Sequence, residues 1–259
     1  MPLALRQPRH RYEAAQLKQV IAQIRFSPML RFELPEFRGA IADFQARVGR
    51  YPRSSQEQQL SVVITPAGPV QGTGAPVWRF TDGDGAWSVV LGRDVAGLET
   101  ARYTVFEDCL ERFVDLVGAV RELGVQHRER LGLRYVNEFR HPEARDPIAW
   151  REFLAEELLG MVGGELLAGA NVEQAIEEIR LRESAGSLVI RHGYVGSPAT
   201  DDPFYLLDID YFNEGGRMLD PNSIGDELWA LHDEIQGVFE VSLKPKMRGH
   251  LGDLGPINA

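Results

Sequence analysis

The chain has 259 residues, and its 28 Lys and Arg against 38 Asp and Glu give a formal charge of 28 − 38 = −10. Hydrophobic residues at 44% and charged residues at 25% are typical of a globular protein, which excludes wholesale disorder. The single cysteine, Cys109, excludes an intramolecular disulfide and a cysteine-rich zinc site. An acidic chain is also a poor general binder of nucleic acid, because that binding depends on neutralising phosphates.

The sequence predicts neither a membrane span nor a secretory signal. No apolar run approaches the roughly 18 residues that a membrane-spanning helix needs. Arg6, Arg9 and Arg11 interrupt the stretch in which a signal peptide would have its apolar centre. We therefore expect a cytoplasmic protein with no membrane partner.

The first half of the chain changes repeatedly between strand and helix periodicity. Residues 18–26 alternate apolar and polar side chains, which predicts a strand, and residues 35–48 carry apolar side chains at helical spacing. The remaining expectations are an arm at 1–15, strands at 58–65, 76–82, 86–92 and 97–104, a loop at 66–76, and a helix at 105–123.

The second half begins the same order again. Residues 129–139 alternate as a strand, and Asp146-Pro147 is an N-cap and first-turn pair that predicts a helix over 147–160. The remaining expectations are strands at 174–183, 187–195, 204–212 and 216–219, a helix at 223–239, and a peripheral tail from Lys244.

These element orders predict an α+β protein built from two copies of a β-α-β4-α unit. The copies would span residues 1–124 and 125–259 and form one continuous domain, a large curved antiparallel sheet with helices on one face. QIRF at 23–26 matches GLRY at 132–135 in the two halves. The arrangement resembles the TATA-binding-protein-like fold, and a helix-grip fold is the alternative. Neither fold implies a function by itself.

Several short motifs lie along the chain between about residues 18 and 243. They are IRFSP at 24–28, YP at 51–52, WRF at 78–80, LETARYTVFEDCLERF at 98–113, RLGLRYVNEF at 130–139, LLDIDYF at 206–212 and LH at 231–232. Together they resemble the motifs of a sporadically distributed, functionally uncharacterised bacterial protein family. The resemblance implies an accessory gene, in a mobile-element or phage-defence setting, and it offers no catalytic residues to carry over.

Two carboxylates on one predicted strand are a candidate metal site. Asp208 and Asp210 are two residues apart, so they share a face at a separation of about 7 Å. Such a pair could hold Mg²⁺ or Mn²⁺ with a water nucleophile. The alternative is a strand whose polar side meets water or arginines.

Charged residues are also frequent on the other predicted strands. Guanidinium groups bind carboxylates and phosphates bidentately, so these side chains form either a ligand or partner site or a network of cross-strand ion pairs. The candidate binding residues are Arg25, Arg134, Tyr135, Asn137 and Arg182; the wider set of strand charges adds Arg79, Arg180, Arg191, Glu99 and Glu138.

Catalytic signatures are missing from the sequence. It contains neither HExxH nor GxSxG, and no glycine loop of the kind that cradles phosphates. We therefore expect a non-catalytic binding protein, without a cofactor, whose open sheet face engages a protein partner or a small anionic ligand. The alternatives are a metal-dependent hydrolase or nuclease using Asp208 and Asp210, and a nucleic-acid-binding sheet using Arg130, Arg134 and Arg140. A homodimer is left open.

Overall fold

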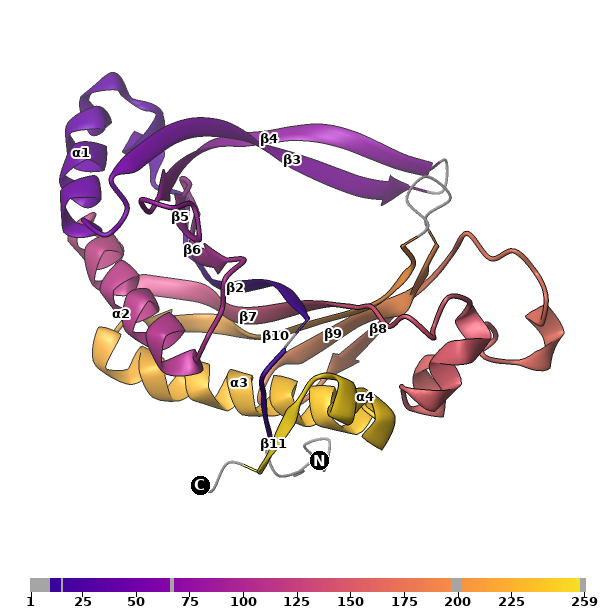
Figure 1. Ribbon diagram of the computed structural model, residues 1–259. Coiled ribbons are helices and arrows are strands. Elements are labelled where there is room, and N and C mark those ends of the chain that lie inside the picture. The colour runs from indigo at the N-terminus through magenta and orange to yellow at the C-terminus, as the bar shows by residue number, and fades with distance from the viewer. Residues whose placement is uncertain (1–9, 15, 66–67, 197–201, 257–259) are drawn as a thin grey trace. The chain divides into compact units, whose positions relative to one another are not determined.

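The computed structural model describes residues 10–14, 16–65, 68–196 and 202–256, with the backbone alone at residues 33, 59–65 and 68–75. The strands are β1 (His10–Tyr12), β2 (Leu17–Arg25), β3 (Arg53–Thr65), β4 (Gly68–Thr81), β5 (Trp87–Leu91), β6 (Val95–Thr100), β7 (His127–Phe139), β8 (Gln174–Arg182), β9 (Ser187–Val195), β10 (Phe204–Met218) and β11 (Asp253–Pro256). The α-helices are α1 (Arg38–Arg47), α2 (Phe106–Glu122), α3 (Pro221–Ser242) and α4 (Pro245–His250) (Figure 1). Short 3₁₀ turns are η1 (Leu30–Glu33), η2 (Pro35–Phe37), η3 (Pro147–Glu152), η4 (Glu156–Leu158) and η5 (Glu165–Leu167).

A large antiparallel sheet dominates the fold. Its nine strands follow the order β3-β4-β5-β6-β2-β7-β10-β9-β8, and β1 and β11 form a separate two-stranded sheet. The α+β class and the large antiparallel sheet are therefore confirmed. The sheet ends at β3 on one side and at β8 on the other.

The chain divides into two compact units. Unit 1 contains residues 1–20, 133–213 and 229–259, and unit 2 contains residues 21–132 and 214–228. The boundary falls within β2, β7, β10 and α3, so each of these elements contributes residues to both units.

Unit 2 buries the apolar stripe of α2 against its strands. Phe106, Cys109, Phe113 and Val117 recur at helical spacing and are all buried, which is the pattern of a helix with one core-facing side. Helix α1 adds Phe44, whose ring centroid lies 5.4 Å from that of Phe80 on β4. Apolar stripes of this kind explain why helices are found where the periodicity at 35–48 and 105–123 predicts them.

Unit 1 packs α3 against one face of β7 and β10. The rings of Phe139 and Phe239 lie 6.0 Å apart, and the Tyr135 hydroxyl lies 3.0 Å from Nδ1 of His232. Turns η3 and η4 contact the same face. The Trp150 ring centroid lies 5.6 Å from that of Tyr205, and the Leu158 carbonyl accepts a hydrogen bond from the Tyr205 hydroxyl. We call the face opposite these contacts the open face of unit 1.

Two predicted interruptions of the sheet are wrong. The Pro- and Gly-rich stretch 66–76 predicts a loop, but β4 begins at Gly68 and pairs with β3 from there to Thr81; residues 66 and 67 lie outside the described ranges. The separate strand expected at 216–219 is the end of β10, which continues through Gly215 and Gly216 to Met218. Strand pairing overrides the weak local propensities of these residues in both cases.

The helix predicted over 147–160 is also wrong. It begins as expected, because the Asp146 side chain accepts a hydrogen bond from the Ala149 amide at 3.0 Å. The chain then forms only the short turns η3 and η4. Leu154 makes a β-bridge with Leu243, and the Ala155 amide donates to the Ser242 carbonyl. These long-range bonds follow η3 and divert the backbone, so the segment does not continue as one helix. The second half therefore departs from the expected β-α-β4-α order.

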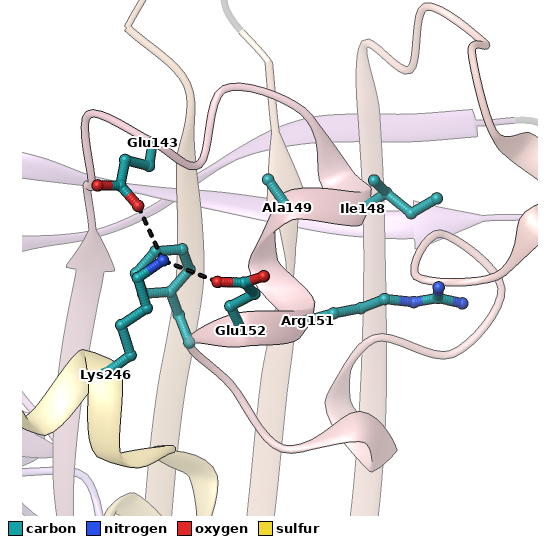
Figure 2. A pocket seen from close by; sticks show the side chains of 7 residues that line it. Glu143, Ile148, Ala149, Arg151, Glu152 and Lys246 are labelled. Carbon is teal, nitrogen blue, oxygen red and sulfur yellow. Dashed lines mark hydrogen bonds and ion pairs between the residues drawn. The ribbon is translucent and has the colours of Figure 1, made fainter.

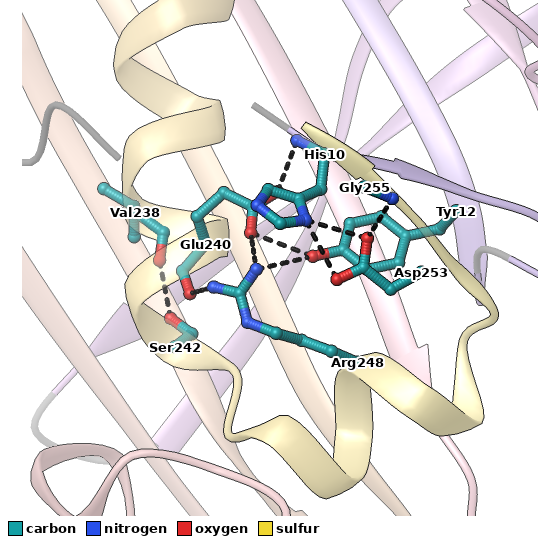
Figure 3. Close-up of polar contacts among 8 residues, drawn as sticks. All are labelled: His10, Tyr12, Val238, Glu240, Ser242, Arg248, Asp253 and Gly255. Carbon is teal, nitrogen blue, oxygen red and sulfur yellow. Dashed lines mark hydrogen bonds and ion pairs between the residues drawn. The ribbon is translucent and has the colours of Figure 1, made fainter. Parts of the chain in front are cut away.

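The C-terminal tail is not peripheral. Met247 of α4 and Leu251 are fully buried, and β11 pairs with β1, the part of the expected N-terminal arm that the structure describes. Figure 3 shows the buried Glu240 carboxylate accepting from the Tyr12 hydroxyl at 2.8 Å and from the His10 amide at 3.1 Å, beside the Arg248 guanidinium. This cluster fastens both ends of the described chain to α3.

Candidate functional site

A bidentate ion pair lies on the open face of unit 1. Arg134 of β7 donates from Nε and Nη2 to the two carboxylate oxygens of Asp208 on β10, each at 2.7 Å. The Asp208 side chain is 3% exposed and that of Arg134 is 38% exposed. The hydrogen bond to Asp208 raises the pKa of Arg134. Two parallel charge-assisted bonds fix both side chains in position.

The ion pairing continues across the next two strands. Arg191 of β9 donates from Nη1 to Asp208 at 3.3 Å and from Nε to Glu178 of β8 at 2.6 Å. Arg180 donates to the other oxygen of Glu178 at 2.7 Å. We call Arg134, Asp208, Arg191, Glu178 and Arg180 the charge ladder. It alternates in sign over four strands.

Strand register explains why these residues meet. Asp208 lies opposite Arg191, and Arg191 lies opposite Glu178, so the three side chains share one face of the sheet. Burial alone would raise the pKa of Glu178, but the hydrogen bonds from Arg180 and Arg191 bring that pKa below its ordinary value. The carboxylate therefore stays ionised at neutral pH.

The five predicted binding residues do not form one site. Arg134 lies on the open face, whereas Tyr135 contacts His232 and Asn137 donates to the Leu207 carbonyl at 3.1 Å on the helix-covered face. Arg25 is exposed at the end of β2 in unit 2, and Arg182 is exposed at the end of β8 in unit 1. Strict alternation along β7 already separates Arg134 from its neighbours Tyr135 and Asn137.

Glu178 is absent from the residues singled out by sequence, although it joins β9 to β8. One sequence feature could have identified Glu178. Glu178, Arg180 and Arg182 are each two residues apart, which places three charges on one face of a short strand. A mixed network of strand charges is one of the two sequence-based alternatives, and such a network is observed in both units. In unit 2, Arg79 bridges Glu57 at 2.9 Å and Glu99 at 2.8 Å.

The Asp208 and Asp210 pair has the wrong surroundings for a divalent metal. Both oxygens of Asp208 already accept from guanidinium groups, which compete with a cation for the same lone pairs. Asp210 acts on the same arginine, since its charge contributes to the raised pKa of Arg134. Across the described ranges, no group of three His, Cys, Asp or Glu side chains could hold a metal ion.

Two of the three arginines expected to bind nucleic acid are held by carboxylates. Arg134 pairs with Asp208, and Arg140 pairs with Glu138 and Asp202, both at 2.9 Å; Arg130 lies 3.5 Å from the Gln23 side-chain oxygen. Arginines held by carboxylates are poorly placed to neutralise phosphates. The arrangement therefore gives little support to a nucleic-acid-binding sheet.

A surface pocket of about 400 Å³ lies elsewhere in unit 1 (Figure 2). Its lining includes Glu143, Glu152, Phe153 and Lys246. The Lys246 ammonium lies 2.8 Å from Glu143, 2.7 Å from Glu152 and 4.7 Å from the centre of the Phe153 ring. These two carboxylates and the ring already surround a cation from the chain itself. None of the described residues that line the pocket carries a hydroxyl, thiol or imidazole nucleophile.

A buried aromatic cluster lies under β9 and β10. The Tyr205 hydroxyl lies 3.0 Å from Nδ1 of His192 and donates to the Leu158 carbonyl. Burial lowers the pKa of His192 and raises that of Tyr205. These groups bind η4 to the sheet.

Burial also raises the pKa of Cys109 to about 12, so this thiol is unreactive at neutral pH.

The sequence matches no protein-family model and no curated protein. Among the described helices, none combines the length and apolar character needed to cross a bilayer.

Proposed function

We propose that this chain is a non-catalytic binding protein that presents the open face of unit 1 to another protein. The observation that carries the proposal is the charge ladder, which holds guanidinium and carboxylate groups in fixed positions across β7, β10, β9 and β8. A surface built this way offers complementary charge in a defined pattern, which favours specific protein docking.

A protein partner fits this surface better than a small anion. The guanidinium groups of Arg134 and Arg191 already bind the chain's own carboxylates, so an anion would have to displace Asp208 or Glu178. A protein surface with both signs of charge can add to the pattern without breaking it. Ile176 of β8, 40% exposed, adds an apolar contact of the kind found at interface centres.

The same proposal includes the cytoplasmic location and the internal duplication. A single buried thiol suits a reducing compartment. The strand order is matched about the β2–β7 pair except for β3, since β6, β5 and β4 follow β2 outward as β10, β9 and β8 follow β7, and β3 has no counterpart in the described sheet. Helices α2 and α3 each follow the last strand that their half contributes to the large sheet. The accessory setting implied by the family resemblance stays a prediction.

Affinity capture with matched variants tests the proposed function. Glu138→Lys with Asp210→Lys reverses charge on the open face of β7 and β10. Glu36→Lys with Asp43→Lys makes the same change at exposed positions of η2 and α1. We expect a partner that is retained by the wild type and by the η2–α1 variant but lost by the open-face variant.

Two results would contradict the proposed function. The first is an identical set of retained proteins for all three folded chains, which would place binding elsewhere. The second is turnover in a broad phosphodiesterase and nuclease screen that the Asp208→Asn variant abolishes, which would favour the hydrolase alternative.

A further inference from the structure

Strand β8 is an edge strand of the large sheet. It pairs with β9 from Gln174↔Val195 to Arg182↔Ser187, and the sheet order of the described strands ends there. Its other edge therefore presents backbone N–H and C=O groups. Edge strands are commonly protected by proline, by a bulge or by charged side chains, lysine above all, because like charges repel a strand that would pair there. The nine residues of β8, QAIEEIRLR, contain neither proline nor lysine, and their register with β9 is continuous.

The charges of β8 are complementary to those of an antiparallel copy of the same strand. A two-fold axis perpendicular to the sheet keeps each side chain on its own face, so it can pass only through a pair of identical residues. With Ile179 opposite itself, Glu178 lies opposite Arg180 of the second copy, and Arg180 lies opposite Glu178. Two opposite-charge pairs then flank an apolar pair.

The neighbouring registers lack this complementarity. An axis at Glu178 places two carboxylates opposite each other, and an axis at Arg180 does the same with two guanidinium groups. Like charges directly opposite destabilise a strand pair. The Ile179 register also extends the charge ladder, because the alternation Arg134, Asp208, Arg191, Glu178 continues into Arg180 of the second copy.

We propose that β8 pairs antiparallel with β8 of a second copy of this chain, about a two-fold axis at Ile179. Both side chains that carry the pairing are accessible: Arg180 is 68% exposed and Glu178 is 36% exposed. The inference goes beyond the proposed function: it uses Glu178 and Arg180 of the charge ladder, but it concerns pairing of the sheet edge with a second copy, not docking of another protein on the sheet face. An interface of nine residues a side is small, so the dimer is weak and depends on concentration.

Sedimentation velocity of single-charge variants tests the pairing and its register. Over about 1 to 200 μM the wild type is expected to pass from monomer to dimer. Glu178→Arg sets the new guanidinium opposite Arg180 of the second copy, and Arg180→Glu sets the new carboxylate opposite Glu178. Each variant alone should raise the dimer dissociation constant at least about tenfold. Arg38→Glu, at the exposed start of α1, should behave as the wild type.

Mixing the two variants gives the decisive result. In an equimolar mixture the two guanidinium groups of the Glu178→Arg chain face the two carboxylates of the Arg180→Glu chain. A heterodimer is therefore expected at wild-type affinity or better. Misfolding of either variant would not be repaired by mixing. A wild type that stays monomeric throughout, variants that associate as the wild type does, or a mixture that stays monomeric would each overturn the proposal.

Discussion

Replacing Asp208 by Asn tests whether the carboxylate stabilises the fold through the charge ladder or serves to bind a metal ion. The amide keeps the size of the side chain but removes the charge, and its NH₂ group faces a guanidinium where an oxygen accepted before. Breaking a buried ion pair by removing one partner costs about 3 to 5 kcal/mol. Arg134 and Arg191 are 38% and 29% exposed, so water compensates them in part and we expect a loss of about 2 kcal/mol.

Urea unfolding followed by circular dichroism measures this loss of unfolding free energy. In thermal unfolding, the melting temperature should fall by about 4 to 8 °C. Asp210→Asn is the matched control, because Asp210 lies on the same face but is only half-buried; its cost should stay under about 1 kcal/mol. Two carboxylates kept together for a metal repel each other when it is absent, so neutralising either would stabilise the free protein. If both substitutions stabilise the protein and Mn²⁺ raises the melting temperature of the wild type, Asp208 serves a metal ion and not the charge ladder.

Three further substitutions test other parts of the structure. Glu240→Gln leaves Arg248 without its buried carboxylate and should lower the free energy of unfolding by about 2 to 4 kcal/mol. It should also speed proteolysis near Tyr12. An unchanged rate of digestion would count against the role of the Glu240 cluster in holding the chain ends. Gly193→Ala would place a Cβ 1.9 Å from the Ala175 carbonyl at a φ of +151°. The substitution should lower the free energy of unfolding by about 3 kcal/mol or more and speed amide hydrogen exchange in β8. Unchanged stability and exchange would contradict the β8–β9 register. Burial lowers the pKa of His192 from its ordinary 6.5. The unfolded chain therefore takes up this proton first, and stability should fall as the pH drops from about 7 to 5. His192→Gln should flatten that slope, and an unaltered slope would assign it to other groups.

Much of the sheet could be predicted from the sequence because its strands have one buried and one polar face. The alternation in 18–26 and 129–139 predicts β2 and β7 within two residues at each end, since burying one face fixes the period. The segment 147–160 could not be predicted, because the bonds that lie between η3 and η4 join it to Ser242 and Leu243. Local pattern carries no information about contacts nearly ninety positions away in the chain, as between Ala155 and Ser242.

The candidate site was predictable in kind but not in membership. Charges on strand faces predicted a mixed network, and Arg134, Asp208 and Arg191 belong to it. Which arginine meets which carboxylate depends on the register of β10 with β9, and no residue of either strand alone specifies that register. Tyr135 and Asn137, which we expect to share a site with Arg134, lie on the other face of the sheet, as the alternation along β7 requires.

Residue-level labelling of carboxylates in the complex with a captured partner tests the proposed docking face most directly. Carbodiimide labelling read by mass spectrometry, at concentrations too low for self-association, reports which carboxylates become covered. We predict that Glu138 and Asp210 become less reactive toward carbodiimide when the partner binds, while Glu36 and Asp43 keep their reactivity. Protection confined to Glu36 and Asp43, with the open face labelled as in the free protein, would contradict it.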